Sequence, residues 1–155
     1  MRVLRLKDNA EVCIREVSLG DLSEVYEIEK LSFKDPYPLD LLHTFAVLNS
    51  DTFLVAVKDG RVVGYVIGVL RWDVIGHILN IAVHPCYRRK GLGELLMREI
   101  MDVFRKKGAR VFRLEVRVSN LAAQRLYEKL GFKKEYTIPN YYSDGEACYV
   151  MFKRD

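Results

Sequence analysis

The middle of the chain alternates between apolar runs and segments of mixed polarity. Three apolar runs follow one another and predict three strands: 52–58, 61–71 and 75–83. Asp59-Gly60 separates the first two runs and is a strong signal for a hairpin turn. Between Gly91 and Gly108 the apolar residues recur every three or four positions, which predicts an amphipathic helix. Residues 111–118 alternate apolar and charged side chains, which indicates a strand with one solvent-facing side.

The N-terminal part contributes one strand and two helices. Residues 12–17 predict the strand, and Ser18 is suited to cap the helix that follows it. Asp35-Pro36 ends that helix, and a second helix is predicted over 38–48.

The C-terminal part predicts one helix and two strands. Asn120 opens the helix and Gly131 closes it, while 132–138 and 147–152 form an antiparallel pair. The full order is β-α-α-β-β-β-α-β-α-β-β, which is typical of a mixed α/β sheet. The passage through the helix at 91–108 is expected to join two parallel strands by a right-handed crossover.

Composition narrows the class of protein. With 155 residues, 50% of them apolar and 30% charged, the chain suits one domain, 1–155, with a full core, and is too apolar to be disordered. No stretch reaches the ~18 apolar residues that a membrane span needs. The net charge of +4 favours an anionic ligand without indicating nucleic-acid binding.

The cysteines and the first residues bear on the compartment. The three cysteines are far apart and form no CxxC motif, so they indicate neither a zinc site nor a redox pair: Cys13, Cys86 and Cys148. The first residues, MRVLRLKDNAEV, lack the apolar segment and cleavage site of a signal peptide. A reducing, cytoplasmic setting is therefore expected.

The strongest candidate for ligand chemistry is the segment 88–93, RRKGLG, between a predicted strand and a predicted helix. The first amides of a helix have no partners inside it, and the helix dipole adds positive potential there. Gly91 and Gly93 lack the Cβ atoms that would keep a pyrophosphate from the backbone. The segment matches neither the Walker A motif nor the G-x-G-x-x-G fingerprint. From spacing alone, a basic helix start without a ligand explains the pattern equally well.

Two motifs in the expected order resemble the GNAT acetyltransferase superfamily. Arg88, Gly91 and Gly93 match R/Q-x-x-G-x-G/A, and the segment 120–132, NLAAQRLYEKLGF, matches N-x-x-A-x-x-x-Y-x-x-x-G-F. Within the superfamily, the stretches GHILNIAVHPCYRRKGLG, LEVRVSNLAAQRLYEKLGF and NYYSDGEACYVM are similar to the ribosomal-protein-alanine and archaeal N-terminal α-acetyltransferases. The resemblance implies a mixed central sheet of about seven strands, with helices on both faces and acetyl-CoA between two splayed parallel strands. It also implies acetyl transfer to a protein N-terminus.

The resemblance places the acetyl-CoA site on one strand, in the glycine loop and on the helix after Asn120. The residues implied are Ile81, Ala82, Val83, Arg88, Arg89, Lys90, Gly91, Leu92, Gly93, Glu94, Asn120 and Tyr127. The backbone of 81–83 is expected to pair with the pantetheine arm, the amides of 89–94 to hold the pyrophosphate, and Asn120 to hydrogen-bond the arm. Tyr127 is expected to protonate or stabilise the leaving thiolate, whose pKa is near ~8.5; the alternative is an aromatic residue packed on the sheet.

By the same resemblance, three residues are candidates for the base that accepts the proton of the attacking amine. Glu115 lies on a strand expected to flank the cleft, where related bacterial enzymes place a glutamate; the alternative is a surface partner of Arg113 or Arg117. His77 lies on the neighbouring strand, where it can share a water or a zinc ion with Glu115, or serve only the fold. The chemistry requires no metal. Asp35 stands where the archaeal relatives have a glutamate before N-Y-P, and its shorter side chain leaves its role in substrate selection open.

The resemblance also implies contacts from two loops to the acceptor peptide: Phe33, Pro36, Tyr37, Tyr141 and Tyr142. Tyrosine packs a peptide with its ring and hydrogen-bonds it with its hydroxyl. The acceptor is expected to be a protein or peptide N-terminus, with ribosomal proteins as one class; neither a membrane nor a specific nucleic acid is expected as a partner. No cysteine occupies a motif position, which favours direct transfer in a ternary complex. Monomer and homodimer both remain open.

Two other functions compete. A GNAT enzyme that acetylates a protein lysine or a small amine would keep the same cofactor site, and an acidic pocket in place of the tyrosine pair would favour it. A nucleic-acid-binding module would use the basic clusters 88–90 and 105–107, but these lie at opposite ends of one predicted helix.

Overall fold

The computed structural model describes all 155 residues and shows one eight-stranded sheet, in the order β1-β2-β3-β4-β5-β6-β8-β7. The strands are β1 (Arg2–Arg5), β2 (Glu11–Glu16), β3 (Phe53–Lys58), β4 (Arg61–Arg71), β5 (Ile75–Val83), β6 (Val111–Arg117), β7 (Lys133–Ile138) and β8 (Cys148–Arg154). All neighbours are antiparallel except β5 and β6, which are parallel. The predicted mixed sheet with one parallel pair is confirmed.

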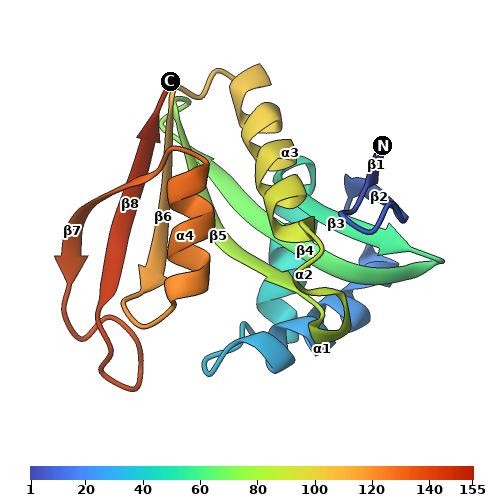
Figure 1. The fold of residues 1–155 in the computed structure, drawn as a ribbon, viewed down its shortest axis with the longest axis horizontal. Coiled ribbons are helices and arrows are strands. Elements are labelled where there is room, and N and C mark those ends of the chain that lie inside the picture. The colour runs from blue at the N-terminus through green and yellow to red at the C-terminus, as the bar shows by residue number, and fades with distance from the viewer.

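Helices cover both faces of this sheet (Figure 1), as expected. The helices are α1 (Leu22–Ser32), α2 (Leu39–Leu48), α3 (Leu92–Lys106) and α4 (Leu121–Lys129), and three 3-10 turns join them to strands: Leu19–Asp21, Ser50–Thr52 and Pro85–Tyr87. α1 and α2 bury their apolar sides in one core cluster, and α3 and α4 in a second. None of the helices combines the length and the apolar character that crossing a membrane requires.

The hairpin of β1 and β2 adds a strand that the sequence analysis did not predict. Arg2 pairs with Ile14 and Arg5 with Glu11, and the turn between them places Asn9 at φ 69°. β1 is four residues long and lies at the sheet edge with mostly exposed side chains, so its alternation is too short to predict a strand. The sheet therefore has eight strands rather than about seven.

The two parallel strands separate after a short paired segment, and this opening positions the site. β5 and β6 pair at three positions, the last of which joins His77 to Arg113. At the paired end, Gly68 of β4 and Gly76 of β5 lie against the ring of Phe104 on α3. A Cβ atom at either glycine would come within 2.6 Å of that ring, so α3 packs this closely only because both residues are glycine. Beyond His77, the edge of β5 that faces β6 has no strand partner.

Candidate active site

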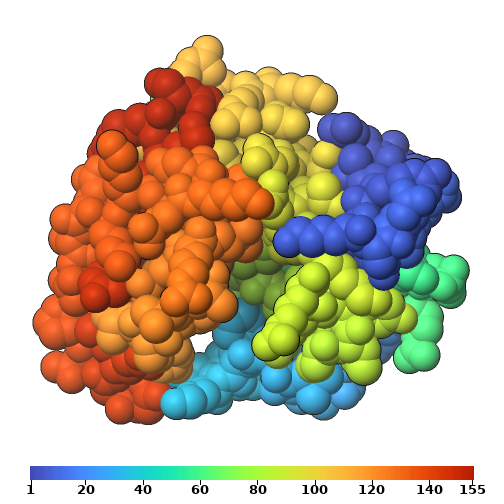
Figure 2. Space-filling view, in the orientation of Figure 1, coloured from blue at the N-terminus to red at the C-terminus, as the bar shows by residue number.

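A groove follows the open edge of β5 to the start of α3. It holds about 380 Å³ and its lining is mostly apolar: Ile81, Ala82, Val83, Tyr87, Arg88, Arg89, Gly91, Leu92, Gly93, Ala122, Ala123, Leu126 and Tyr127. In Figure 2 it is the hollow between the orange surface of α4 and the yellow-green surface that follows β5. The residues expected around acetyl-CoA line this groove, except Lys90, Glu94 and Asn120. Tyr87, Ala122, Ala123 and Leu126 line it without having been predicted.

The loop at the end of the groove has the features of an anion site. The amides of residues 89–94 donate to no acceptor within the protein. The first helical bond of α3 runs from the amide of Leu95 to the carbonyl of Gly91, so the amides of the first helical turn are free. Gly91 has φ 83°, a left-handed conformation that a Cβ atom would strain. Six successive free amides at the positive end of a helix dipole suit a pyrophosphate.

The turn between β1 and β2 supports this loop. The amide of Lys7 donates to the carbonyl of Lys90 at 2.9 Å, and Lys90 Nζ lies 3.2 Å from the carboxylate of Asp8. Glu94 is paired with Lys129 of α4 at 2.8 Å. The side chains of Lys90 and Glu94 are therefore used within the protein, and each offers its backbone amide to a ligand.

Two further predicted cofactor residues also make contacts inside the protein. Arg88 Nε donates to the carbonyl of Val83 at 3.0 Å, and its Nη2 lies 3.4 Å from Ser32 Oγ at the end of α1. Asn120 caps α4, because its Oδ1 accepts from the amide of Ala123 at 3.1 Å. Arg88 thus ties the loop to β5 and α1, and Asn120 keeps its Nδ2 donors for another partner.

Tyr127 lies on the wall of the groove formed by α4. Its ring packs against Phe132, with ring centroids 6.1 Å apart, and the side chain is almost fully buried. Burial raises the pKa of its hydroxyl to about 12. The hydroxyl is therefore protonated at neutral pH and available as a hydrogen-bond donor, while the ring also does the packing that the alternative predicted.

His77 and Glu115 form a direct hydrogen-bonded pair where β5 and β6 separate. His77 Nε2 lies 2.8 Å and 3.0 Å from the two carboxylate oxygens of Glu115, and Arg113 Nε donates to the same carboxylate at 3.1 Å. Burial acts to raise the pKa of Glu115, but His77 and Arg113 more than offset it and hold that pKa below its usual value. Glu115 is therefore ionised at neutral pH. The ion pair with Arg113 that was the alternative reading coexists with the His77 contact.

The structure contains no cluster of three or more His, Cys, Asp or Glu side chains arranged to hold a metal ion. All three cysteines are free. Cys148 is buried on β8, and burial, with a further contribution from the charge of Glu115, raises its pKa. That thiol stays protonated and is a weak nucleophile. Cys86 is exposed in the turn after β5, outside the groove lining.

A buried carboxylate that sequence reasoning did not single out lies on α1. Glu29 has no exposed surface and accepts hydrogen bonds from the amide of Tyr37 at 2.8 Å, the side-chain amide of Asn80 at 2.8 Å and the hydroxyl of Tyr65. Burial raises the pKa of Glu29 above its usual value. The one signal in the sequence was a glutamate beside Ile28 on an otherwise apolar helix face. Glu29 joins α1 to β4, to β5 and to the loop that carries Tyr37.

The tyrosines of both predicted peptide loops lie near Glu115. Burial raises the pKa of Tyr37 to about 12, and the negative charge of Glu115 contributes to that shift. The same charge adds to the effect of burial on the pKa of Tyr141. Tyr141 and Tyr142 pack edge to face, with ring centroids 4.9 Å apart. The structure therefore brings these two loops, far apart in the sequence, to the opening between β5 and β6.

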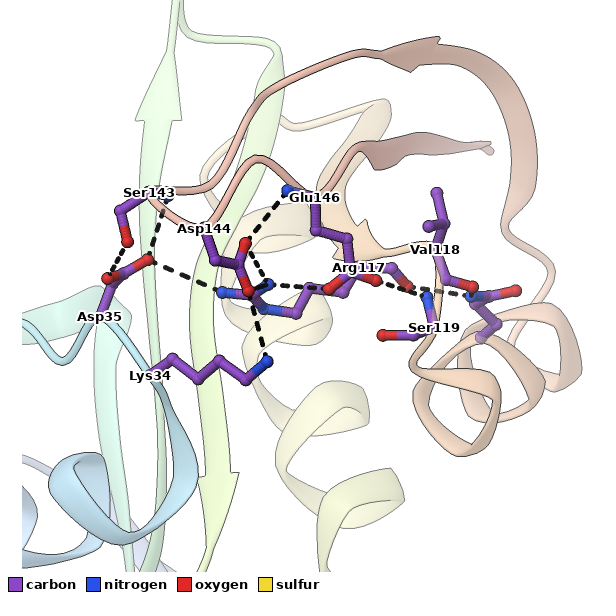
Figure 3. Close-up of polar contacts among 9 residues, drawn as sticks. Lys34, Asp35, Arg117, Val118, Ser119, Ser143, Asp144 and Glu146 are labelled. Carbon is purple, nitrogen blue, oxygen red and sulfur yellow. Dashed lines mark hydrogen bonds and ion pairs between the residues drawn. The ribbon is translucent and has the colours of Figure 1, made fainter.

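Asp35 makes its polar contacts with the opposite loop rather than with His77 and Glu115. Its carboxylate accepts from the amide of Ser143 at 3.3 Å and from the Ser143 hydroxyl, and it lies 3.7 Å from Arg117 (Figure 3). Phe33 packs against the core under α1 and α2, and Pro36 is exposed. The position of Asp35 fits a role in shaping the peptide loops better than a role in proton transfer.

The sheet, groove and glycine loop together match a known family. The model of the acetyltransferase (GNAT) family matches residues 22–132. This chain belongs to the GNAT family. An N-alpha-acetyltransferase of Sulfurisphaera tokodaii is 34% identical to this GNAT chain over 97% of it and 98% of the relative. The ribosomal protein bS18-alanine N-acetyltransferase of Escherichia coli K12 is 34% identical, over 89% and 93%. The crystal structure of Ard1 from Thermoplasma volcanium matches with a TM-score of 0.89 and 34% identity, over 92% and 97% of the two chains.

The geometry of this GNAT acetyltransferase fits acetyl-CoA, its acetyl donor. The six free amides at the start of α3 suit the pyrophosphate of coenzyme A. The open edge of β5 suits the amide groups of an extended pantetheine arm, which pairs with it as an added strand would. Tyr127 borders the same groove. The residues present therefore match the parts of this co-substrate.

Proposed function

We propose that this GNAT enzyme transfers acetyl directly from acetyl-CoA to the free α-amine of a protein N-terminus, within a ternary complex. The observation that carries the proposal is that the Glu115 carboxylate lies on β6, at the opening between β5 and β6 along which the cofactor groove runs, and that Tyr37 and Tyr141 of the two peptide loops are close enough to feel its charge. The names of the relatives, N-alpha-acetyltransferase and ribosomal-protein-alanine N-acetyltransferase, support this acceptor class.

The backbone holds the cofactor. The amides of 89–94 bind the pyrophosphate, and the open edge of β5 at Ile81 and Ala82 pairs with the pantetheine arm. Asn120 donates to that arm from Nδ2, since its Oδ1 is used in capping α4. The carbonyl of Val83 is already bonded to Arg88, so Val83 contributes mainly as a wall of the groove.

Glu115 accepts the proton that the attacking amine loses. An α-amine has a pKa near ~7.7–8.0, against ~10.4 for a lysine side chain, so a sizeable fraction is neutral at physiological pH. A weak base that acts through one water is therefore sufficient, and a carboxylate with a lowered pKa serves this purpose. His77 and Arg113 hold that carboxylate in place by donating to it.

Tyr127 stabilises the leaving thiolate by hydrogen bonding. With a pKa of about 12 its hydroxyl keeps its own proton, since the thiol of coenzyme A has a pKa near ~8.5. The final proton on the thiol then comes from water. Direct transfer needs no acetylated cysteine, and the only buried thiol, Cys148, is a weak nucleophile because its pKa is raised. The reaction also requires no metal ion at His77 and Glu115.

The peptide loops bind the first residues of the acceptor. Tyr37, Tyr141 and Tyr142 supply rings and hydroxyls to the peptide backbone, and Phe33 and Pro36 complete the first loop. Ribosomal proteins are one acceptor class that this arrangement serves. Three free cysteines fit a reducing, cytoplasmic location.

The nucleic-acid alternative is weakened by the ion pairs that one of its two basic clusters, 105–107, makes within the protein. Arg105 is bonded to Asp102 and Asp155, and Lys107 is paired with Asp51. The cluster at the end of α3 is therefore largely neutralised within the protein and is separated from 88–90 by the length of that helix. A phosphate-binding stripe would need both clusters free on one face.

The test is thiol release from acetyl-CoA across a set of acceptors. Short peptides beginning Ser, Ala, Met-Leu and Met-Glu are compared with an N-blocked peptide that carries an internal lysine, and with a polyamine. The proposal predicts turnover with free N-termini, and the order among them reports the first residues that the peptide loops accept. Turnover of the blocked peptide or the polyamine alone would leave the cofactor site standing and overturn the N-terminal assignment.

A further inference from the structure

A network of charged and polar side chains at the end of β6 joins the two peptide loops (Figure 3). It consists of Lys34, Asp35, Arg117, Ser143, Asp144 and Glu146, here called the Arg117 clasp. Lys34 and Asp35 belong to the loop between α1 and α2, whereas Ser143, Asp144 and Glu146 belong to the loop between β7 and β8. Arg117 is the last residue of β6 and lies between the two loops.

Arg117 contacts every carboxylate of the clasp. Its Nη1 lies 3.0 Å from an oxygen of Asp144 and 2.8 Å from one of Glu146, and its Nη2 lies 3.7 Å from Asp35. The guanidinium carbon also stands 3.9 Å from the centre of the Tyr142 ring. One planar cation therefore fixes three carboxylates and one proposed peptide-binding ring at once.

The two loops also touch each other directly. Lys34 Nζ lies 3.3 Å from Asp144, and Ser143 donates to Asp35 from its amide at 3.3 Å and from its hydroxyl. These partners are 108 to 110 residues apart in the sequence. The second oxygen of Glu146 accepts from the amide of Ser119 at 2.9 Å, immediately before α4. The clasp therefore links both peptide loops to the start of the helix that carries Tyr127.

We infer that Arg117 is a positioning residue for the acceptor peptide: it sets the spacing between the loop of Tyr37 and the loop of Tyr141 and Tyr142. The inference rests on the proposed function and names the side chain that assembles its peptide site. Arg117 forms no hydrogen bond or ion pair with Glu115, so it acts on binding geometry and not on proton transfer. It explains why Asp35 is held away from the His77–Glu115 pair.

Arginine is required here because lysine cannot replace its contacts. A guanidinium offers five donors in a plane and stacks on a ring, whereas an ammonium is a compact point charge.

Several members of the clasp are partly open to solvent, with exposed fractions of 44% for the side chain of Asp35 and 35% for that of Asp144. Salt therefore weakens the clasp, and the wild-type protein should bind peptide less well as the ionic strength rises.

The experiment compares Arg117→Met and Arg117→Lys with a matched control, Arg154→Met. Arg154 also pairs with a carboxylate, Glu135, and lies over a ring, Phe152 at 5.1 Å, but it is at the far end of β8. kcat and KM are measured separately for peptide and for acetyl-CoA, at about 20 mM and about 500 mM NaCl. The Met variant should raise the peptide KM ~10-fold or more with an unchanged acetyl-CoA KM, and the Lys variant should recover only part of this loss. The salt dependence of the peptide KM should disappear in Arg117→Met and persist in Arg154→Met.

An unchanged peptide KM in Arg117→Met, or an equal rise for both substrates, would overturn the inference. If that variant does not fold, the double variant Asp35→Asn with Ser143→Ala removes the Ser143–Asp35 contacts and the Asp35–Arg117 ion pair, and leaves Arg117 on Asp144 and Glu146. It should raise the peptide KM alone; no rise would overturn the inference as well. The proposed function is contradicted if the wild-type protein transfers no acetyl to α-amines. The inference about Arg117 is contradicted if the peptide KM of the variant does not rise relative to that of the wild type, measured with whichever peptide the wild type acetylates. The two failures are therefore distinct.

Discussion

Arg71 determines which nitrogen of His77 carries the proton. An arginine Nε always bears hydrogen, and here it donates to His77 Nδ1 at 2.8 Å, so Nδ1 is the acceptor. The proton of the neutral imidazole therefore lies on Nε2, which donates to Glu115 at 2.8 Å. His77 points a donor at the carboxylate and leaves the role of base to Glu115.

Replacing Glu115 with Gln removes this base and keeps an acceptor for His77. Because the pKa of Glu115 is lowered, the residue is ionised throughout the neutral range, and the pH profile reports the amine. We expect kcat/KM for peptide to fall ~10²-fold near pH ~6.5 and less near pH ~9, where the amine is neutral without help. Thiol-release rates across this range check the effect, with Glu135→Gln as a surface control. A uniform loss, or none, would shift the assignment to His77 or to solvent.

Replacing Tyr127 with Phe keeps the packing against Phe132 and deletes the hydroxyl. We expect kcat to fall ~10²-fold while the affinity for acetyl-CoA changes little, because the hydroxyl acts on the leaving group. Single-turnover rates and calorimetric binding of acetyl-CoA measure the two quantities. Tyr87→Phe, which alters another tyrosine of the same groove, serves as the control. An unchanged turnover in Tyr127→Phe would remove this residue from the chemistry.

Replacing Glu29 with Gln tests the cost of a buried carboxylate. Burial raises the pKa of Glu29 in the folded state above 4.5, so the folded protein holds this proton more tightly than the unfolded chain does. The stability that this group contributes is full below pH 4.5 and is lost as the pH rises through the folded pKa. The free energy of unfolding of Glu29→Gln should therefore improve relative to wild type as the pH rises.

Urea unfolding of both proteins between about pH 4 and about pH 8 gives this difference directly, because the other acids are common to both. A difference that stays constant over the range would contradict a raised pKa at Glu29.

Replacing the two glycines of the loop separates folding from cofactor binding. A Cβ atom on Gly93 would lie 3.4 Å from Leu126, an ordinary contact, so Gly93→Ala should fold normally and raise the KM for acetyl-CoA ~10-fold. Gly91 has φ 83°, so Gly91→Ala should also lower the free energy of unfolding by ~1 kcal/mol. Thermal unfolding with kinetics distinguishes the two variants; normal acetyl-CoA kinetics in Gly93→Ala would contradict the placement of the pyrophosphate.

Features with local causes were predictable from the sequence. The bounds of β4 and β5 agree with the apolar runs, because Asp59-Gly60 and His84-Pro85 end the strands by their own backbone preferences. The anion loop was equally visible, since a glycine-containing helix start needs nothing beyond neighbouring residues to leave its amides free. Of the sheet, only the short edge strand β1 was missed.

Features that depend on tertiary contacts were not predictable. Glu29 draws its partners Tyr65 and Asn80 from 36 and 51 residues away, so its helix pattern alone showed only a polar interruption. Arg88 matches a motif, yet its guanidinium binds Val83 and Ser32, a direction that no spacing specifies. The order of the strands in the sheet decides which charged side chains come into contact. The pattern of residues along the chain does not predict these contacts.

The central claim is that the acceptor is an α-amine. Its most direct test is a competition within one molecule: a peptide with a free N-terminus and one internal lysine is acetylated by the wild-type protein, and tandem mass spectrometry locates the acetyl group. The proposed function predicts acetyl on the α-nitrogen, with the lysine unmodified while the α-amine remains in excess. Acetyl on the lysine ahead of the N-terminus would contradict it.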